Sequence, residues 1–431
     1  MVGSVACMLF AAVGKGGATW AGLLAIIGNV LLISCVLKAN LQVAFGASIV
    51  CLNAFLPLLV RNHPSLQSEP EDVPPQEAGL YSAVPQDEAT QPLTEITPSE
   101  TRQSLLLSTR ISTQGIAVGY TSGVFLQLTT IPLVILTGST TKSLQLAVLI
   151  SGVWWALFTI PAAVWMRPRP GPPLPTSKSN HPVRRIIGYG IYGWKVIGAT
   201  LAQARRLKDV MFFLAAWFLL SDGYTTITST AILFAKTTLG IGPAGLALIG
   251  ILATTAGILG AVLWPRVLTP RLKLLHNSPH KTILLILCLS LFIPLYGLLG
   301  FLPILQRLGF GGLVNKYEIY GLAFIFGFLY GGVQGYCRSL FAELVPKGLE
   351  ANMFALYAVT DKGSSAVGPA VVGLITDLTH EIRWAFLFLG LMIGMSIPLM
   401  RKIDVVRGKA DAEAWSAERQ IHEQEEEPRE G

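Results

Sequence analysis

Two adjacent charged residues, Asp361 and Lys362, lie inside the apolar stretch YAVTDKGSSAVGPAVVGLITD, which runs from Tyr357 to Asp377. An ionisable group within a membrane span is costly, so it normally faces a cavity, a partner or a transport pathway. A carboxylate can hold an ammonium group, and a lysine can hold a carboxylate. The pair would therefore suit a zwitterion. The alternative is a purely structural ion pair between helices, for instance between Lys362 and Asp222.

Small and polar residues surround this pair if the segment is helical. Asp361 then shares a face with Ser364, and Lys362 shares a face with Ser365. Because residues that are adjacent in a helix diverge by about 100°, Asp361 and Lys362 need not bond to each other. Pro369 removes a backbone hydrogen bond near Ser365, so we expect a bend there.

A second apolar stretch, LLSDGYTTITST, contains a polar stripe that begins at Asp222. Thr225, Thr226 and Ser229 follow it by three, four and seven residues, which places all four on one face of a helix. We expect this face to line a cavity. The alternative is a helix–helix interface in which the hydroxyl groups bond to backbone carbonyls. Gly223, next to Asp222, predicts a kink or a local break in this helix.

Other polar residues lie in or near apolar segments. Four of them are weaker candidates for lining a cavity: Asn53, Gln127, Tyr330 and Gln334. Three more lie at the cytoplasmic end of a predicted span and are expected to form a gate or a loop network: Arg338, Glu343 and Lys347.

The composition indicates that these stretches are membrane segments. Of the 431 residues, 52% are hydrophobic and 13% are charged, whereas soluble domains have about 25% charged residues. A span needs about 20 apolar residues, and a helix satisfies its own backbone in lipid. We therefore predict an all-α membrane protein of about ten transmembrane helices, at residues 1–14, 19–60, 114–137, 145–166, 210–235, 243–267, 282–303, 318–337, 353–376 and 383–402.

Basic residues between the spans predict which side each connection occupies. The segment 167–209 has nine Lys and Arg residues and one acidic residue, and 265–281 has four and none. Both should face the cytoplasm, because cytoplasmic loops are enriched in positive charge. Counting spans then places 61–112 and the C-terminal tail on the same side. The segment 61–112 has eight acidic residues and many Pro, Ser and Gln residues, so we expect it to be disordered.

Several function classes find no support in the sequence. It has no HExxH, P-loop or GxSxG motif, so we predict no enzyme, no cofactor and no metal site. The basic patches lie between apolar spans, so the expected partner is the lipid bilayer and not nucleic acid. All five cysteines fall in apolar segments, and we interpret them as membrane-buried residues rather than a disulfide framework.

Two long stretches resemble a known family: SDGYTTITSTAILFAKTTLGI and LVPKGLEANMFALYAVTDKGSSAVGPAVVGLITDLTHEIRWAFLFL. The shorter stretches GASIVCLNAFLPLLV and RISTQGIAVGYTSG share the resemblance. The family is that of the fungal vacuolar effluxers of the major facilitator type, known as autophagy-related protein twenty-two. The resemblance covers most of the chain from Gly46 to Met400.

The resemblance implies a twelve-helix transporter in the vacuolar membrane. It also implies that the protein releases leucine and other neutral amino acids to the cytosol after autophagic bodies are degraded. Transporters of this type contain two helical bundles that rock about a midplane site. The resemblance supplies no residue-level binding site, so the candidate residues rest on the intramembrane polar groups described above.

Two departures from the family pattern are expected to matter. The family's first two helices have no counterpart before Met1, which predicts an N-terminally truncated chain. In addition, ISCVLKANLQVA, at 33–44, interrupts what should be one helix and resembles an insert. Since both features affect helices that face the central cavity, they put transport by this chain in question.

With the resemblance, the chain divides into six predicted regions. They are a remnant of the first bundle (1–60), a disordered acidic cytoplasmic loop (61–112), the rest of the first bundle (113–166), a basic cytoplasmic central loop (167–209), a six-helix second bundle (210–402) and an acidic cytoplasmic tail (403–431). From Gly408 the tail is expected to fray into solvent.

Two other functions remain open from the sequence. One is a permease for a sugar or another metabolite. The other is a membrane scaffold or lipid scramblase that supports the breakdown of autophagic bodies without transporting a solute. The charged pair discriminates between these classes, since a scaffold should tolerate Asp361→Asn and Lys362→Met.

Overall fold

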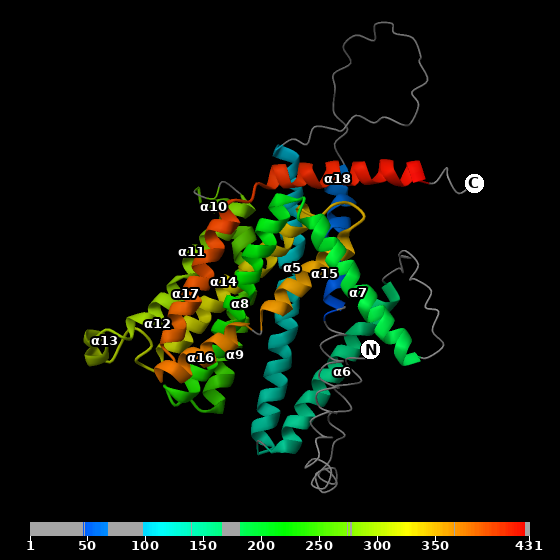
Figure 1. Ribbon diagram of the computed structural model, residues 1–431. Coiled ribbons are helices and arrows are strands. Elements are labelled where there is room, and N and C mark those ends of the chain that lie inside the picture. Colours follow the sequence, from blue (N-terminus) through cyan, green and yellow to red (C-terminus); the bar gives the residue numbers. More distant parts are fainter. Residues whose placement is uncertain are drawn as a thin grey trace, which may run out of the picture.

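The fold is built of helices, as a computed structural model shows (Figure 1). The structure describes residues 46, 48–67, 98–138, 140–165, 182–273, 275, 278–365 and 367–426. Within these ranges no strand is present. The predicted span 1–14, the stretch 33–44 and most of the acidic loop lie outside the described residues.

Seven helical segments in the described ranges are long and apolar enough to cross a membrane. They match seven of the predicted spans and confirm an all-α membrane protein. In chain order they are α5 (Pro98–Leu136), α6 (Thr141–Trp165), α8 (Lys208–Thr237), α9 (Pro243–Leu263) with η2 (Trp264–Leu268) and α10 (Thr269–Arg271), α11 (Pro279–Ser290) with α12 (Phe292–Leu299), α14 (Glu318–Glu343) and α17 (Trp384–Arg401).

The predicted span 353–376 consists of two shorter helices. These are α15 (Glu350–Ser364) and α16 (Val367–Thr379). The interruption lies where the sequence predicts a bend, because Pro369 has no N–H to donate to the carbonyl of Ser365. The predicted bend is therefore confirmed. The end of the predicted span 19–60 is an apolar helix, Ser48–Arg61.

The core of the second bundle is aromatic. Trp217 on α8 stacks on Tyr357 of α15 with ring centroids 5.0 Å apart, and Phe341 of α14 lies 5.1 Å from the same ring. Phe213 and Phe354 complete the cluster. Because stacked and edge-to-face rings are favourable beyond the area they bury, this cluster fixes α8, α14 and α15 relative to one another. It lies near the side that the basic loops predict to face the cytoplasm; this side is called cytoplasmic below, and the opposite side lumenal.

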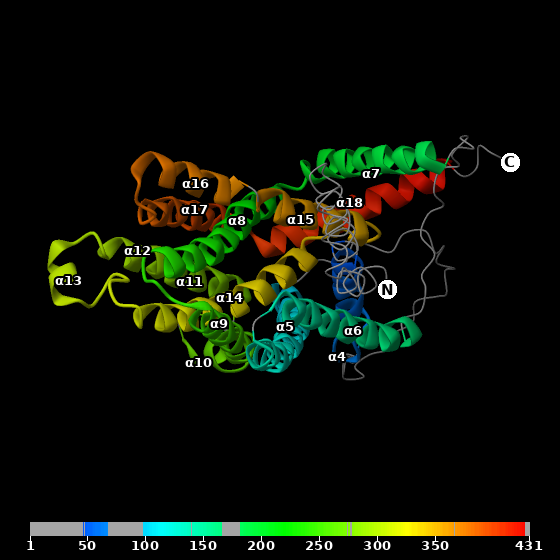
Figure 2. The same ribbon diagram turned by 90° about the horizontal axis from the view of Figure 1, so that it is seen from below.

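The first bundle contacts the second through one half of α5. All nine buried residues of this helix lie between Thr101 and Ala117, and none lies in the lumenal half. In this half α5 packs against α9 and α14 (Figures 1 and 2). Thr109 hydrogen-bonds Ser339 of α14 at 2.8 Å. Small hydroxyl residues allow this close, hydrogen-bonded approach between helices.

Helix α5 begins earlier than the sequence predicts. Residues 98–112 belong to the predicted disordered loop, yet they are helical. The reason is that the last acidic residue of the loop is Glu100, and the buried residues recur from Thr101 at helical spacing. This part of the loop can therefore pack against another helix, which an isolated polar segment cannot do.

Two helices lie outside the two bundles. In the basic central loop, α7 (Pro182–Ala204) contacts α8 and α15. In the C-terminal tail, α18 (Val405–Glu426) lies across the cytoplasmic ends of the bundles (Figure 1). The expectation that the tail frays from Gly408 is wrong for the first turns of α18, because Ala412 and Ser416 are buried against the bundles.

Helices α9 and α14 approach each other through small residues. A Cβ atom added at Gly331 would lie 2.1 Å from the carbonyl oxygen of Gly257, and one added at Gly327 would lie 2.0 Å from that of Ala253. Gly327 and Gly331 form the GxxxG spacing that allows backbones to touch in a membrane. This contact brings α14 to the centre of the structure.

We predict that Gly331→Ala destabilises the protein and Gly321→Ala does not. The added methyl group at Gly331 meets backbone, and overpacking of this kind costs about 1–3 kcal/mol. Gly321 lies on the same helix with no atom within 4 Å of an added Cβ. Thermal unfolding of the purified protein in detergent measures the effect. Equal melting temperatures for the two variants would contradict the close packing of α9 and α14.

Candidate functional site

A polar stripe on α14 is the centre of the candidate site. Between Leu329 and Ala342 every residue is buried except three: Tyr330, Gln334 and Arg338. They recur every four residues and therefore share one helix face. Gln334 donates a hydrogen bond to the Tyr330 hydroxyl at 2.5 Å. An accessible polar stripe on an otherwise buried central helix is a suitable wall for a solute pathway.

Asp361 lies on α15, which packs with α14 in the aromatic core. Its carboxylate accepts a hydrogen bond from Ser221 of α8 and forms an ion pair with Lys362 at 3.0 Å. The Lys362 side chain is 62% exposed, whereas that of Asp361 is 21% exposed. The alternative prediction, an ion pair between Lys362 and Asp222, is therefore wrong. Lys362 pairs with its own neighbour because a lysine side chain is long enough to fold back to it.

Asp222 serves the broken helix instead. Its Oδ1 accepts the backbone N–H of Gly368, the second residue of α16, at 3.1 Å, and the Thr226 hydroxyl at 3.4 Å. The first N–H groups of a helix have no partner within it, and an acidic side chain satisfies them. Only a residue without a side chain fits at Gly368, since a Cβ there would lie 2.7 Å from Asp222 Oδ1.

Asp222 therefore does not line an open stripe with the other three residues of its predicted face. Asp222 and Thr226 are buried, whereas Thr225 and Ser229 are exposed on another side of α8. The predicted break at Gly223 is also wrong, because α8 is continuous from Lys208 to Thr237. The interruption that exposes backbone groups lies in the facing helix, after α15.

The remaining candidates have structural contacts or lie apart. The hydroxyls of Ser364 and Ser365 donate to the carbonyls of Asp361 and Lys362, at 3.1 and 2.8 Å, at the end of α15. Asn53 is buried on the helix Ser48–Arg61. Among the described residues it has no hydrogen bond to another member of the candidate site.

Arg338 is predicted from the sequence to belong to a cytoplasmic gate or loop network. Because α14 continues to Glu343, Arg338 lies more than one turn inside the helix. No described residue forms a hydrogen bond or an ion pair with its guanidinium. The four-residue spacing from Tyr330 and Gln334 was the signal that could have placed it in the stripe.

Arg338 and Asp361 flank one aromatic contact between α14 and α15. Asp361 lies one turn from Tyr357 on α15, and Arg338 lies about one turn from Phe341 on α14. The rings of Tyr357 and Phe341 are 5.1 Å apart. The site thus combines one carboxylate and one guanidinium without a described partner, together with the Tyr330 hydroxyl on the same face of α14 as Arg338.

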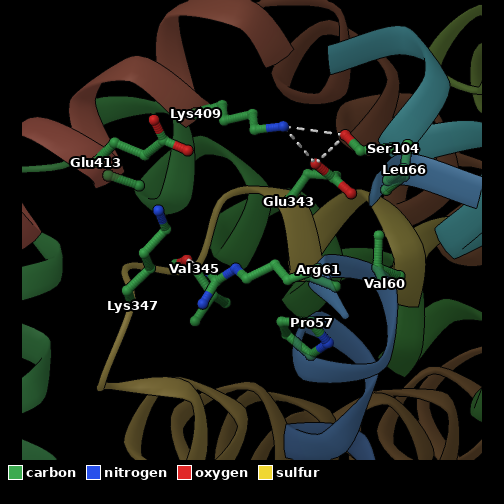
Figure 3. Close-up of a pocket in the computed structure, with 12 residues that line it drawn as sticks. Pro57, Val60, Arg61, Leu66, Ser104, Glu343, Val345, Lys347, Lys409 and Glu413 are labelled. Carbon is green, nitrogen blue, oxygen red and sulfur yellow. Dashed lines mark hydrogen bonds and ion pairs between the residues drawn. The ribbon is translucent and has the colours of Figure 1, made fainter. Parts of the chain in front are cut away.

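Charged residues join the two bundles at their cytoplasmic ends (Figure 3). Glu343 of α14 accepts a hydrogen bond from Ser104 of α5 at 2.8 Å and pairs with Lys409 of α18 at 3.4 Å. Arg61 of the first bundle pairs with Glu350 of α15 at 2.8 Å. These contacts form a cytoplasmic network that links the two bundles, as the sequence predicts for Glu343. Arg61, Glu343 and Lys409 of this network line the pocket that Figure 3 shows.

Comparison with known proteins identifies the family. The family model described as "Vacuole effluxer Atg22 like" matches residues 1–413. The chain belongs to the Atg22-like vacuole effluxer family. It is 43% identical to Autophagy-related protein 22-1 of Neosartorya fischeri over 97% of this chain. It is 44% identical to Autophagy-related protein 22-2 of Sclerotinia sclerotiorum and 45% identical to Autophagy-related protein 22 of Botryotinia fuckeliana, over 95% of this chain in each case.

The Atg22-like chain spans 71%, 63% and 63% of the lengths of these three relatives. Family membership and the seven apolar helices make it a multi-pass protein of the vacuolar membrane. Its helical architecture and apolar helices agree with a family of membrane transporters of the major facilitator type. Among its described residues no group of three or more His, Cys, Asp or Glu side chains could hold a metal ion.

The C-terminal helix of this Atg22-like effluxer is held to the second bundle by one buried carboxylate. Asp209, in the first turn of α8, accepts two hydrogen bonds from Arg407, at 2.7 and 2.9 Å. It also accepts the backbone N–H of Asp404 at 2.9 Å. A bidentate arginine–carboxylate pair is strong and directional. The pair therefore positions α18 so that Lys409 reaches Glu343.

We predict that Asp209→Asn releases α18 from the bundles. The substitution removes the charge that orients Arg407 and leaves a buried amide that cannot accept both of its hydrogen bonds. Trypsin should then cut after Lys409 and Arg419 several times faster than in the unmodified protein. Glu418→Gln, an exposed change on the same helix, is the control and should not alter the cleavage rate. Protection that persists in Asp209→Asn would show that other contacts hold α18.

Proposed function

We propose that this protein exports neutral amino acids, leucine among them, from the vacuole to the cytosol after autophagic degradation, by alternating access. The family description names a vacuole effluxer, and the relatives are named autophagy-related. The observation that supports an amino acid is that α15 and α14 contribute one acid and one base, Asp361 and Arg338, beside the same aromatic cluster, and that no described residue pairs with the Arg338 guanidinium.

The two charges fit the two ends of an amino acid. Asp361 would hold the ammonium group and Arg338 the carboxylate, which is the ligand that a guanidinium binds best. Counted from Glu343 and Glu350, where the two helices meet at a short connection, Arg338 and Asp361 lie at depths that differ by about 9 Å. The long arginine side chain and the substrate itself can bridge this separation.

The remaining surface of the site favours an uncharged side chain. Tyr330 packs against Tyr224 and Phe326, with ring centroids 4.9 and 5.5 Å apart. Aromatic walls with few polar groups are typical of sites for small apolar groups. No further charged residue is needed for a substrate whose only charges are its ammonium and carboxylate groups.

The interface between the bundles suits a rocking mechanism. It is bridged on the cytoplasmic side by the cytoplasmic network, whereas the lumenal half of α5 has no buried residue. The second bundle is held together at its lumenal end by Glu318, which accepts the backbone N–H groups of Gly311, Leu313 and Asn315. A rigid bundle that can separate at its cytoplasmic face is what alternating access requires.

The first test is transport itself. Vacuolar vesicles that contain the protein should release preloaded labelled leucine faster than vesicles that lack it, and excess unlabelled leucine should slow the release of another labelled neutral amino acid. Competition by a sugar but not by leucine would favour a permease for another metabolite. Equal release from both kinds of vesicle would favour a scaffold or scramblase.

The second test assigns the two charges with substrate analogues. Arg338→Gln should weaken inhibition by leucine about tenfold or more, since a charge-assisted hydrogen bond is lost, but should leave inhibition by leucinamide unchanged. Leucinamide has no carboxylate for Arg338 to hold. Asp361→Asn should weaken inhibition by leucine but leave inhibition by 4-methylpentanoate unchanged. This analogue has no ammonium group for Asp361 to hold.

Lys362→Met is the matched control for this assignment. Lys362 is exposed, and its one ion pair among the described residues is with Asp361, so its removal should change the inhibition constants of leucine and leucinamide little. If Arg338→Gln weakens leucine and leucinamide equally, Arg338 does not bind the carboxylate. If Lys362→Met abolishes leucine binding instead, the carboxylate belongs to Lys362.

A further inference from the structure

A cavity of about 310 Å³ opens between α5 and the cytoplasmic end of α9, apart from the site described above. It lies at the junction of the two bundles. Two arginines, Arg110 and Arg266, line it together with Gln114 and the apolar residues Val118 and Val262. We propose that it binds the headgroup of an anionic phospholipid from the cytosolic leaflet.

The charges in this cavity are not balanced by the protein. The lining contains no acidic residue. Both arginines are exposed, and within the described ranges no side chain or backbone group hydrogen-bonds or pairs with either guanidinium. Two cations at one cavity repel each other unless an anion lies between them. A phosphate diester meets this need and fits the planar guanidinium group.

The depths of the charged and apolar residues in the membrane fit an amphiphilic ligand better than a free ion. Helix α5 enters the membrane from the cytoplasm, so Gln114 and Val118 lie one and two turns deeper than Arg110. Helix α9 runs in the opposite direction, so Val262 lies one turn deeper than Arg266. Charge therefore lies at headgroup depth and apolar surface below it. The Val118 side chain is 71% exposed, as expected where an acyl chain lies against the helix.

Arg266 is held on a defined element rather than on a loose loop. It lies in the π-helix η2, next to Pro265. The segment is anchored by Thr269, whose hydroxyl hydrogen-bonds those of Tyr336 and Thr282, at 2.6 and 3.1 Å. Short π-helical segments recur at functional sites because the wider turn reorients a side chain. Here the wider turn is followed directly by the anchored residue Thr269, which holds Arg266 at the cavity.

The experiment is thermal unfolding of the purified 431-residue chain in detergent with short-chain lipids. Dioctanoyl phosphatidylserine should raise the melting temperature in a saturable way, and dioctanoyl phosphatidylcholine should not. Arg110→Gln with Arg266→Gln should weaken the apparent affinity for phosphatidylserine at least about tenfold. Arg271→Gln, an exposed change on α10 outside the cavity, is the control and should respond as the unmodified protein does.

Three results would overturn the proposal. Equal stabilisation by phosphatidylcholine would show that the site does not select a net negative charge. Inorganic phosphate that stabilises as well as phosphatidylserine at the same concentration would show a free-anion site. The third result is that phosphatidylserine has no effect, while the double variant, but not Arg271→Gln, melts at a lower temperature without lipid. This result would indicate that an acidic segment of this chain binds the two arginines. The segment 68–97, with its seven acidic residues, is one such segment.

Discussion

The hydrogen bond from the Gly368 N–H to Asp222 is the constraint on which the site depends. A helix interrupted inside a membrane leaves backbone groups without partners, and each one is costly in lipid. Asp222 satisfies one of them from the neighbouring helix, and Gly368 allows the two helices to approach closely enough. The interruption after Ser364 is thereby tolerated. It ends α15 three residues after Asp361, which then faces Ser221 and the polar stripe of α14.

A second constraint is the burial of α14. Small residues let it touch α9, and Thr109 and Ser104 bind it to α5. Between Leu329 and Ala342 the helix has one accessible face, and that face has Tyr330, Gln334 and Arg338. The same helix ends at Glu343 in the cytoplasmic network. In the proposed transport cycle, solute binding at the polar stripe and opening of the cytoplasmic network would therefore both act on α14. This shared helix gives the coupling between them a physical basis.

The candidate site could be predicted in part from single spans. A bend near Ser365 follows from Pro369, and a role for Tyr330 and Gln334 follows from polarity in an apolar run. The partners of charged residues could not be predicted in this way. Lys362 pairs with Asp361 and not with Asp222. Asp222 instead accepts the backbone N–H of Gly368, which the interruption in the helix leaves without a partner. The place of Arg338 depends on how far α14 continues beyond the apolar run, which hydropathy does not report.

The sequence by itself determined the class of the protein. Long apolar runs, clustered basic loops and the scarcity of charge require a helical membrane protein, because lipid leaves the backbone no other solution. The periodicity within each run also determined which residues share a face. Only the tertiary structure decided which faces meet, since a helix face is satisfied equally by lipid, by a cavity or by another helix. The close approach of α9 and α14, the cap that Asp222 provides and the docking of α18 through Asp209 are all contacts between segments far apart in the chain, and their geometry exists only after the helices pack.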